Sequence, residues 1–189
     1  SVVKMENWER HMLWSDFEYP WNPPSPALLT FEQTKLYSTF GLLAGLNLAV
    51  GRGLDNSFAF RVFGAPFITV QEQDQILLSL KSLNLKGVEF SKYNWIVTRR
   101  EFRGKQCRGI KIKINNFEQL DPYLTGLSVL KVFTSELIGK LEFERLKFRL
   151  GHKGVVDALK GDASVQDLMQ LSQHGLKEFR RKRNKHLIY

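Results

Sequence analysis

In the stretches that follow residues 69, 121 and 164, apolar residues recur at the three- and four-residue spacing of an α-helix. Four signals for the start of a helix accompany this pattern. Three are residue pairs that can cap a helix, Thr30 with Gln33, Thr69 with Glu72 and Ser164 with Asp167, and the fourth is Asp121-Pro122, because proline is accepted at a helix start. We therefore predict helices after these four points. The last should run on to the basic end of the chain, with Leu168 and Phe179 on one face.

Other stretches carry the pattern of β-strands. Residues 88–98 are rich in aromatic side chains, and residues 110–114 alternate isoleucine with lysine, which is typical of a half-exposed strand. Residues 41–66 are rich in glycine and poor in charge, which indicates strands and tight turns packed deep in the protein. Residues 142–150 are predicted to form one more strand. Because helices and strands mix without βαβ alternation, we predict a single α+β domain with a mixed or antiparallel sheet and flanking helices.

A proline-rich segment lies near the N-terminus. Residues 19–26 contain four prolines, which exclude a helix or a central strand and predict a rigid, extended loop. Trp21 gives this loop an aromatic ring that can be buried or can stack on a ligand. At the other end of the chain, the apolar residues 187–189 are expected to dock rather than to fray.

The net charge of the 189 residues is +9, and the excess lies near the C-terminus, at Lys177, Arg180, Arg181, Lys182, Arg183 and Lys185. Such a cluster can attract nucleic acid, anionic lipid or an acidic polymer. It also suits the negative end of a solvated helix, which is the interpretation we favour. No apolar run is long enough to span a bilayer, so membrane insertion is not expected.

Several kinds of chemistry find no support in the residues. The four histidines are scattered without metal-ligand spacing, so no metal and no cofactor is expected. Cys107, the single cysteine, is interpreted as structural. A glycosidase needs two carboxylates about 5 to 10 Å apart. Asp16, Glu18 and Asp55 lie near the proline-rich loop and the glycine-rich segment, but nothing singles them out, and the catalytic residues stay unknown.

An ordered set of motifs then points to a family. In chain order they are Trp8-Glu9-Arg10, the residues 20–26, Gly45-Leu46-Asn47, Gly51-Arg52-Gly53, Phe63-Gly64-Ala65-Pro66, Cys107-Arg108-Gly109-Ile110, Thr125-Gly126-Leu127 and Leu187-Ile188-Tyr189. Together they resemble the C-terminal half of the NamZ-type exo-β-N-acetylmuramidases. The resemblance covers essentially residues 5–189.

The resemblance implies a function and a partner. Family enzymes release N-acetylmuramic acid from the non-reducing ends of peptidoglycan fragments, in a cleft between a Rossmann-like N-terminal domain and a mixed, barrel-like C-terminal domain. Residues 1–189 would be that C-terminal domain. The N-terminal half, expected to supply the main catalytic carboxylates, is missing, so we expect this chain to be inactive alone. A periplasmic or secreted location is what the resemblance favours.

The chain also departs from the family pattern. Two glutamates of the pattern are replaced by Ala44 and Val50, two threonines by Leu46 and Leu54, and a tryptophan of the last helix by Ser172. These changes replace hydrogen-bonding groups with apolar surface, which weakens a polar sugar site.

Three residues remain as substrate-binding candidates. Arg52 could pair with the lactyl carboxylate of muramic acid or could brace its own loop. Asn47 could hold a sugar hydroxyl or cap a turn, and Trp21 could stack on a sugar face or belong to the core. A degenerate domain that binds glycan or protein without catalysis is the alternative function. A nucleic-acid-binding module ranks last, since no recognition motif accompanies the basic cluster.

Overall fold

The computed structural model describes residues 1–51, 56–99, 101–151 and 153–189. The strands in these residues are β1 (Val62–Ala65), β2 (Val88–Ile96) and β3 (Gln106–Ile114). The α-helices are α1 (Phe31–Phe40), α2 (Val70–Ser82), α3 (Pro122–Glu136), α4 (Leu146–Leu150), α5 (Lys153–Lys160), α6 (Val165–Ser172) and α7 (Leu176–Asn184). Short 3-10 turns are η1 (Trp14–Asp16), η2 (Leu43–Gly45) and η3 (Asn56–Phe58).

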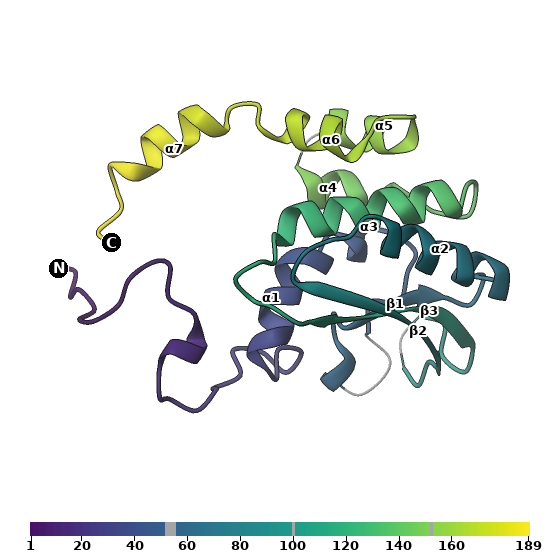
Figure 1. Cartoon of the computed structure of the whole chain (residues 1–189), viewed down its shortest axis with the longest axis horizontal. Helices are drawn as coiled ribbons and strands as arrows, with labels where there is room; N and C mark the ends of the chain where they lie inside the picture. Colours follow the sequence, from purple (N-terminus) through teal and green to yellow (C-terminus); the bar gives the residue numbers. More distant parts are fainter. Residues whose placement is uncertain (52–55, 100, 152) are drawn as a thin grey trace.

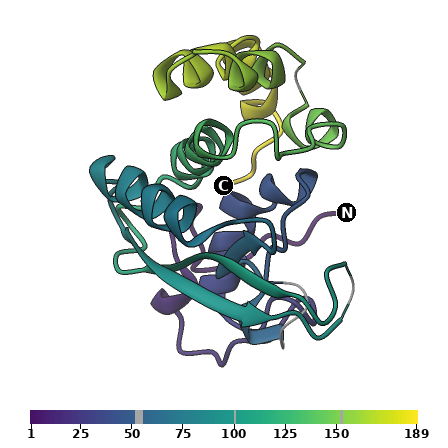
Figure 2. The same cartoon turned by 90° about the vertical axis from the view of Figure 1, so that its right-hand side faces the viewer.

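The strands form an antiparallel sheet in the order β1-β3-β2, so β3 lies at its centre. β3 pairs with the whole of β2, with Ser91 opposite Lys111, and with β1, where Phe63 lies opposite Ile110. Helices α2 and α3 lie next to each other over one face of this sheet (Figures 1 and 2). The α+β class and the antiparallel sheet are therefore confirmed. Over the described residues the sheet is open and does not close into a barrel.

The core has two parts because side chains alternate between the two faces of the sheet. Phe63 of β1 is fully buried on the helix-covered face, with the rings of Phe40 and Phe133 at 4.6 and 5.4 Å between centroids. A smaller cluster on the opposite face contains Ala49, Val62, Trp95, Val97 and Cys107. The glycine-rich residues 41–66 supply members of both clusters and include β1, as their low charge predicts.

All four predicted helix starts are confirmed. A side-chain oxygen of the first residue accepts a hydrogen bond from a backbone N–H inside the helix in each case, at Thr30, Thr69, Asp121 and Ser164. The signals that predicted these starts act within one turn of the chain, so tertiary packing does not need to be known to recognise them.

The predicted strand over residues 142–150 is wrong. The segment contains α4, which ends at Gly151 in the left-handed conformation, with φ of 68°. Leu146, Phe148 and Leu150 alternate with basic residues, a pattern that a strand can also show. However, Leu146 is fully buried while Phe148 is 79% exposed, so these side chains do not share one face as they would in a strand.

The predicted single C-terminal helix is divided. α6 ends before Gly175, whose φ of 73° places it in the left-handed region, and α7 begins after it. Leu168 of α6 is fully buried, whereas Phe179 of α7 is 57% exposed. The apolar face that the sequence suggested therefore does not continue through Gly175.

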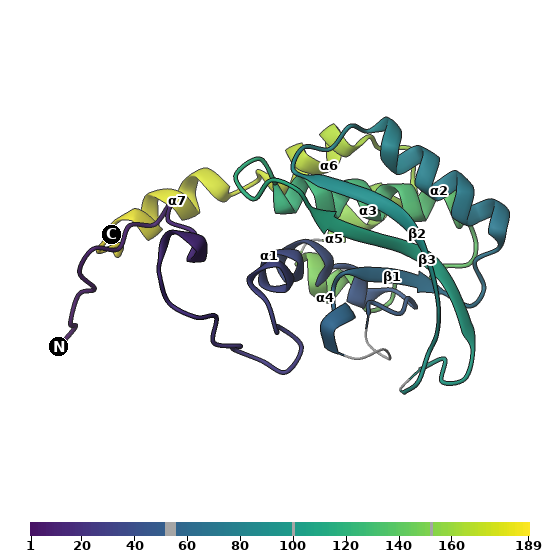
Figure 3. The same cartoon turned by 60° about the horizontal axis from the view of Figure 1, so that its bottom comes forward.

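The two ends of the chain meet away from the sheet. Figure 1 shows that α7 and the N-terminal residues extend from the same side of the body of the protein and that the two chain ends lie close together, and Figure 3 shows the same extension from another direction. The rings of Trp8 and Tyr189 contact edge to face at 4.9 Å, and the Tyr189 hydroxyl accepts a hydrogen bond from the Met5 N–H. The C-terminal tail is docked, as predicted. None of the helices in the described residues is long and apolar enough to cross a membrane.

Candidate functional site

The segment of residues 44–50, which carries part of the family-like pattern, lines a cavity of about 320 Å³. Its walls come from three parts of the chain: the 44–50 segment, the connection between β2 and β3, and the start of α4. The residues that line it are Ala44, Leu46, Leu48, Ala49, Val50, Glu101, Phe102 and Arg145. We call this space the 44–50 cavity.

Backbone contacts hold the 44–50 segment in place. Ala49 and Gly64 exchange two backbone hydrogen bonds, of 2.8 and 3.1 Å, which attach the segment to β1. Gly45 packs against α4 so closely that a Cβ atom added there would lie 2.9 Å from the Leu146 Cα. This approach brings the segment against α4, and it explains why Arg145, the residue before Leu146, borders the cavity.

Asn47 connects the segment to the loop that precedes α4. Its side-chain amide donates to the Lys140 carbonyl oxygen, and its amide oxygen accepts from the Glu142 N–H, both at 3.0 Å. The Lys140 ammonium in turn contacts Glu72 of α2 at 2.6 Å. Burial alone would raise the pKa of the Glu72 carboxyl, but hydrogen bonds from Lys140 and Thr69 hold that pKa below its ordinary value. The geometry thus gives Asn47 a bracing role, while its contact with sugar stays a prediction.

Replacing Asn47 with alanine is expected to lower the free energy of unfolding by about 1 to 3 kcal/mol, since its two hydrogen bonds to the loop before α4 are lost. Urea denaturation followed by circular dichroism measures this change. Asn115→Ala is the matched control, because the Asn115 side chain is exposed. Equal losses in the two variants would contradict the bracing role.

The cavity combines an apolar floor with a charged rim. Leu46 and Val50 are only 7% and 3% exposed, so their side chains form wall rather than surface. Glu101 and Arg145 are exposed residues at the rim. Neither makes an ion pair with another residue in the described ranges. Opposite charges are thus available to a ligand on the same rim.

Residues 35–189 match the family model described as the C-terminal part of the exo-β-N-acetylmuramidase NamZ. The chain belongs to this family. It is 31% identical to the peptidoglycan β-N-acetylmuramidase NamZ of Bacillus subtilis over 195 residues, which cover all of this chain and 45% of the relative. A crystal structure of a DUF1343 family protein from Bacteroides fragilis matches with a TM-score of 0.81 at 20% identity, over all of this chain and 50% of its own. The chain spans about half the length of these relatives.

Three of the five departures from the NamZ-type pattern lie on the cavity. Ala44, Leu46 and Val50 all line it, where the pattern carries glutamate, threonine and glutamate. Ser172, at the position of a family tryptophan, lies elsewhere: its hydroxyl is 2.5 Å from the Tyr123 hydroxyl and donates to the Leu168 carbonyl. Leu54, the remaining departure, lies outside the described residues. Among the described departures of this NamZ-type chain, those in the 44–50 segment meet at the cavity and Ser172 does not.

Trp21, another predicted site residue, lies in a different part of the structure from Asn47. Trp21 lies in an aromatic cluster near the N-terminus, with the Trp14 and Phe31 rings at 5.3 and 5.8 Å and its ring N–H donated to the Leu28 carbonyl at 3.2 Å. Trp21 does not line the 44–50 cavity. Arg52 lies outside the described residues, so its role stays a prediction.

Two of the carboxylates suggested by the sequence, Asp16 and Glu18, do not line the cavity. Asp16 accepts a hydrogen bond from the Leu13 N–H and caps η1, and Glu18 is exposed. Asp55 lies outside the described residues. Glu101, which does line the cavity, was missed, as was Arg145. No local pattern marks either residue, because each reaches the cavity only through tertiary packing.

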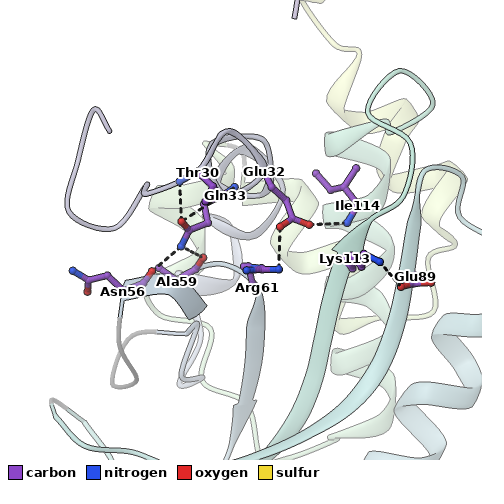
Figure 4. Close-up of polar contacts among 9 residues, drawn as sticks. All are labelled: Thr30, Glu32, Gln33, Asn56, Ala59, Arg61, Glu89, Lys113 and Ile114. Atoms are coloured by element: carbon purple, nitrogen blue, oxygen red, sulfur yellow. Dashed lines mark hydrogen bonds and ion pairs between the residues drawn. The ribbon is translucent and has the colours of Figure 1, made fainter. Parts of the chain in front are cut away.

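The start of α1 holds another polar cluster (Figure 4). Glu32 forms an ion pair with Arg61 at 3.1 Å and accepts a hydrogen bond from the Ile114 N–H. Gln33 is fully buried and donates to the carbonyl oxygens of Asn56 and Ala59. These contacts attach α1 to the sheet and to residues 56–59. The Glu32 carboxylate is thus engaged in structure.

The remaining chemistry is limited. Burial raises the pKa of the Cys107 thiol to about 11, so this cysteine is protonated and unreactive at neutral pH, which agrees with a structural role. The described residues contain no group of three metal-ligating side chains. A larger surface concavity, of about 640 Å³, lies between the end of α2 and β2, away from the 44–50 segment.

Proposed function

We propose that this chain is the C-terminal half of a glycosidase that releases N-acetylmuramic acid from the non-reducing ends of peptidoglycan fragments. The observation that carries the proposal is the 44–50 cavity, because the family-like segment forms its wall. Membership of the NamZ family supports the glycosidase class and the cell-wall substrate.

The chain should be inactive without a second half. Glycoside hydrolysis needs two carboxyl groups about 5 to 10 Å apart across the scissile bond. Glu101 is the one carboxylate among the described residues that line the 44–50 cavity. We infer that a second domain, of the Rossmann-like type expected from the resemblance, closes over the cavity and supplies catalytic carboxylates. The half-length match to the relatives is consistent with such a partner.

A complementation assay tests this proposal. Release of N-acetylmuramic acid from a chromogenic muramoside is measured with this chain alone, with a separately expressed N-terminal half of a NamZ-type protein, and with the two mixed. We expect turnover in the mixture only. Turnover by this chain alone would contradict the need for a partner, and an inactive mixture in which the halves bind each other would contradict the enzyme itself.

A degenerate binding domain is the second candidate, and the apolar floor favours it. Ala44, Leu46 and Val50 cannot supply the hydrogen bonds that a polar sugar loses when it leaves water. In the mixed assay, the double variant Ala44→Glu with Val50→Glu separates the two ideas. Turnover that appears only with the restored glutamates indicates a degenerate chain, whereas turnover of the unmodified mixture indicates an enzyme.

A further inference from the structure

We propose that Arg145 binds the carboxylate of the ligand in the 44–50 cavity and that the neighbouring apolar wall receives a methyl group beside it. A muramic acid residue carries both groups on one short substituent, its lactyl ether. The choice of this ligand rests on the proposed function. The placement of the two binding surfaces rests on the cavity alone.

The size of the cavity limits what it can hold. Ligand pockets generally range from about 300 to 1,000 Å³. At about 320 Å³ the 44–50 cavity is at the low end, and it has room for one sugar-sized group. A site of this size fits the terminal unit of a chain and excludes a long glycan from lying within it.

Charge distinguishes one sugar from another at the rim. An arginine is always protonated and offers several N–H donors in a planar fork that matches a carboxylate. Arg145 has no carboxylate partner among the described residues, so its pairing capacity is free for a ligand. Glu101, on the same rim, can accept hydrogen bonds from sugar hydroxyls but would repel a carboxylate placed next to it. The acid group of the ligand should therefore lie on the Arg145 side.

The apolar floor of the cavity suits a methyl group of the ligand. Leu46 and Val50 are almost fully buried and line the cavity together with Ala44, Leu48 and Ala49, all apolar residues. A hydroxyl-rich sugar face gains nothing from such a wall, but a methyl group gains by leaving water. Leu46 and Val50 stand where the family pattern has polar residues. Their apolar side chains therefore favour the lactyl ether, which bears both a methyl group and a carboxylate, over sugar hydroxyl groups.

Arg145 is also held where the proposal requires it. It directly precedes Leu146, whose Cα approaches Gly45, and the loop before it is tied to Asn47. The backbone of Arg145 is therefore positioned by contacts of the same segment that contains Leu46. Asn47 acts as a positioning residue in this arrangement.

Binding to the unmodified chain provides the test, and it requires no turnover. Amide spectra of the labelled chain are titrated with N-acetylmuramic acid, with its uncharged methyl ester, and with N-acetylglucosamine, which lacks the lactyl group. We expect N-acetylmuramic acid to bind at least about tenfold more tightly than the other two, equivalent to about 1.4 kcal/mol. Shifted amides should include residues 44–50. Equal binding of the three sugars, or no binding of any, would overturn the proposal.

Substitutions of Arg145 test whether this residue binds the carboxylate of the ligand. Arg145→Gln should lower the affinity for N-acetylmuramic acid about tenfold and leave the affinity for N-acetylglucosamine unchanged. The affinity of Arg145→Lys for N-acetylmuramic acid should lie between these values, because lysine keeps the charge but lacks the planar set of N–H donors. Arg103→Gln, in the same β2–β3 connection as Glu101, is the matched control and should bind as the unmodified chain. Loss of binding with Arg52→Gln but not with Arg145→Gln would assign the carboxylate elsewhere and overturn the proposal.

The outcomes for the two proposals are separable. An inactive mixture of halves together with carboxylate-dependent binding would contradict the enzyme and retain the Arg145 site. An active mixture whose KM for muramosides is unaffected by Arg145→Gln would retain the enzyme and contradict the site. The comparison with the methyl ester uses the unmodified chain, so it holds even if a variant folds poorly.

Discussion

Replacing Phe63 with alanine is expected to lower the free energy of unfolding by about 3 to 5 kcal/mol, which is enough to unfold many domains of this size. Phe63 is fully buried at the centre of the larger core cluster. Its ring stacks on Phe40 of α1 and lies against Phe133 of α3. Removing it leaves a cavity among three elements that the sequence separates widely. Urea denaturation followed by circular dichroism measures the loss.

Phe148→Ala is the matched control, because the same ring is removed from a site that is 79% exposed. A surface substitution of this kind should change stability by less than about 0.5 kcal/mol. Similar losses in the two variants would mean that the Phe40–Phe63–Phe133 contacts do not organise the core. The comparison also tests the assignment of α4, since a strand at residues 142–150 would have buried Phe148 together with Leu146.

The sequence predicted those parts of the fold that depend on local chemistry. A hydroxyl or carboxylate side chain that caps a helix acts on N–H groups two or three residues away, so the starts of α1, α2, α3 and α6 were visible in the sequence. The alternation of isoleucine and lysine in β3 likewise follows from one buried and one exposed face.

The errors arose where tertiary packing decides between two local patterns. In α4 the alternating apolar residues fit a strand, but Leu146 and Leu150 also have the four-residue spacing of a helix, and packing of Leu146 in the core selects the helix. At Gly175 the apolar periodicity continues past a residue that adopts a left-handed conformation, so the periodicity alone predicted one helix too long.

The candidate site was only partly predictable for the same reason. The 44–50 segment was found because its motif resembles the family pattern. Glu101 and Arg145 reach the cavity from the β2–β3 connection and from α4, and no spacing in the sequence indicates that they meet there. The decisive contact is the approach of Gly45 to Leu146, which joins positions about one hundred residues apart.

Replacing Gly64 with alanine should lower the free energy of unfolding by an amount similar to that expected for Phe63→Ala. It should also alter the 44–50 cavity. Gly64 lies opposite Gly109 in the β1–β3 pair, and a Cβ atom added to Gly64 would lie 2.2 Å from the Arg108 carbonyl oxygen. Backbone atoms cannot yield as a flexible side chain can, so the strands must separate. We expect a loss of about 3 kcal/mol, at the upper end of the cost of overpacking.

The same substitution should reshape the 44–50 cavity, because Gly64 exchanges both hydrogen bonds with Ala49. Gly64→Ala should therefore shift the amide signals of residues 44–50. It should also weaken the binding of N-acetylmuramic acid, even under conditions where the chain stays folded. Gly161→Ala is the control, since the atoms nearest to its added Cβ lie 3.8 Å away, and it should change neither property. If Gly64→Ala lowers stability but leaves sugar binding unchanged, the contact between β1 and the 44–50 segment does not shape the binding site. A joint loss would mean that the close approach of two glycines in the sheet is what allows the 44–50 segment to lie where a ligand can use it.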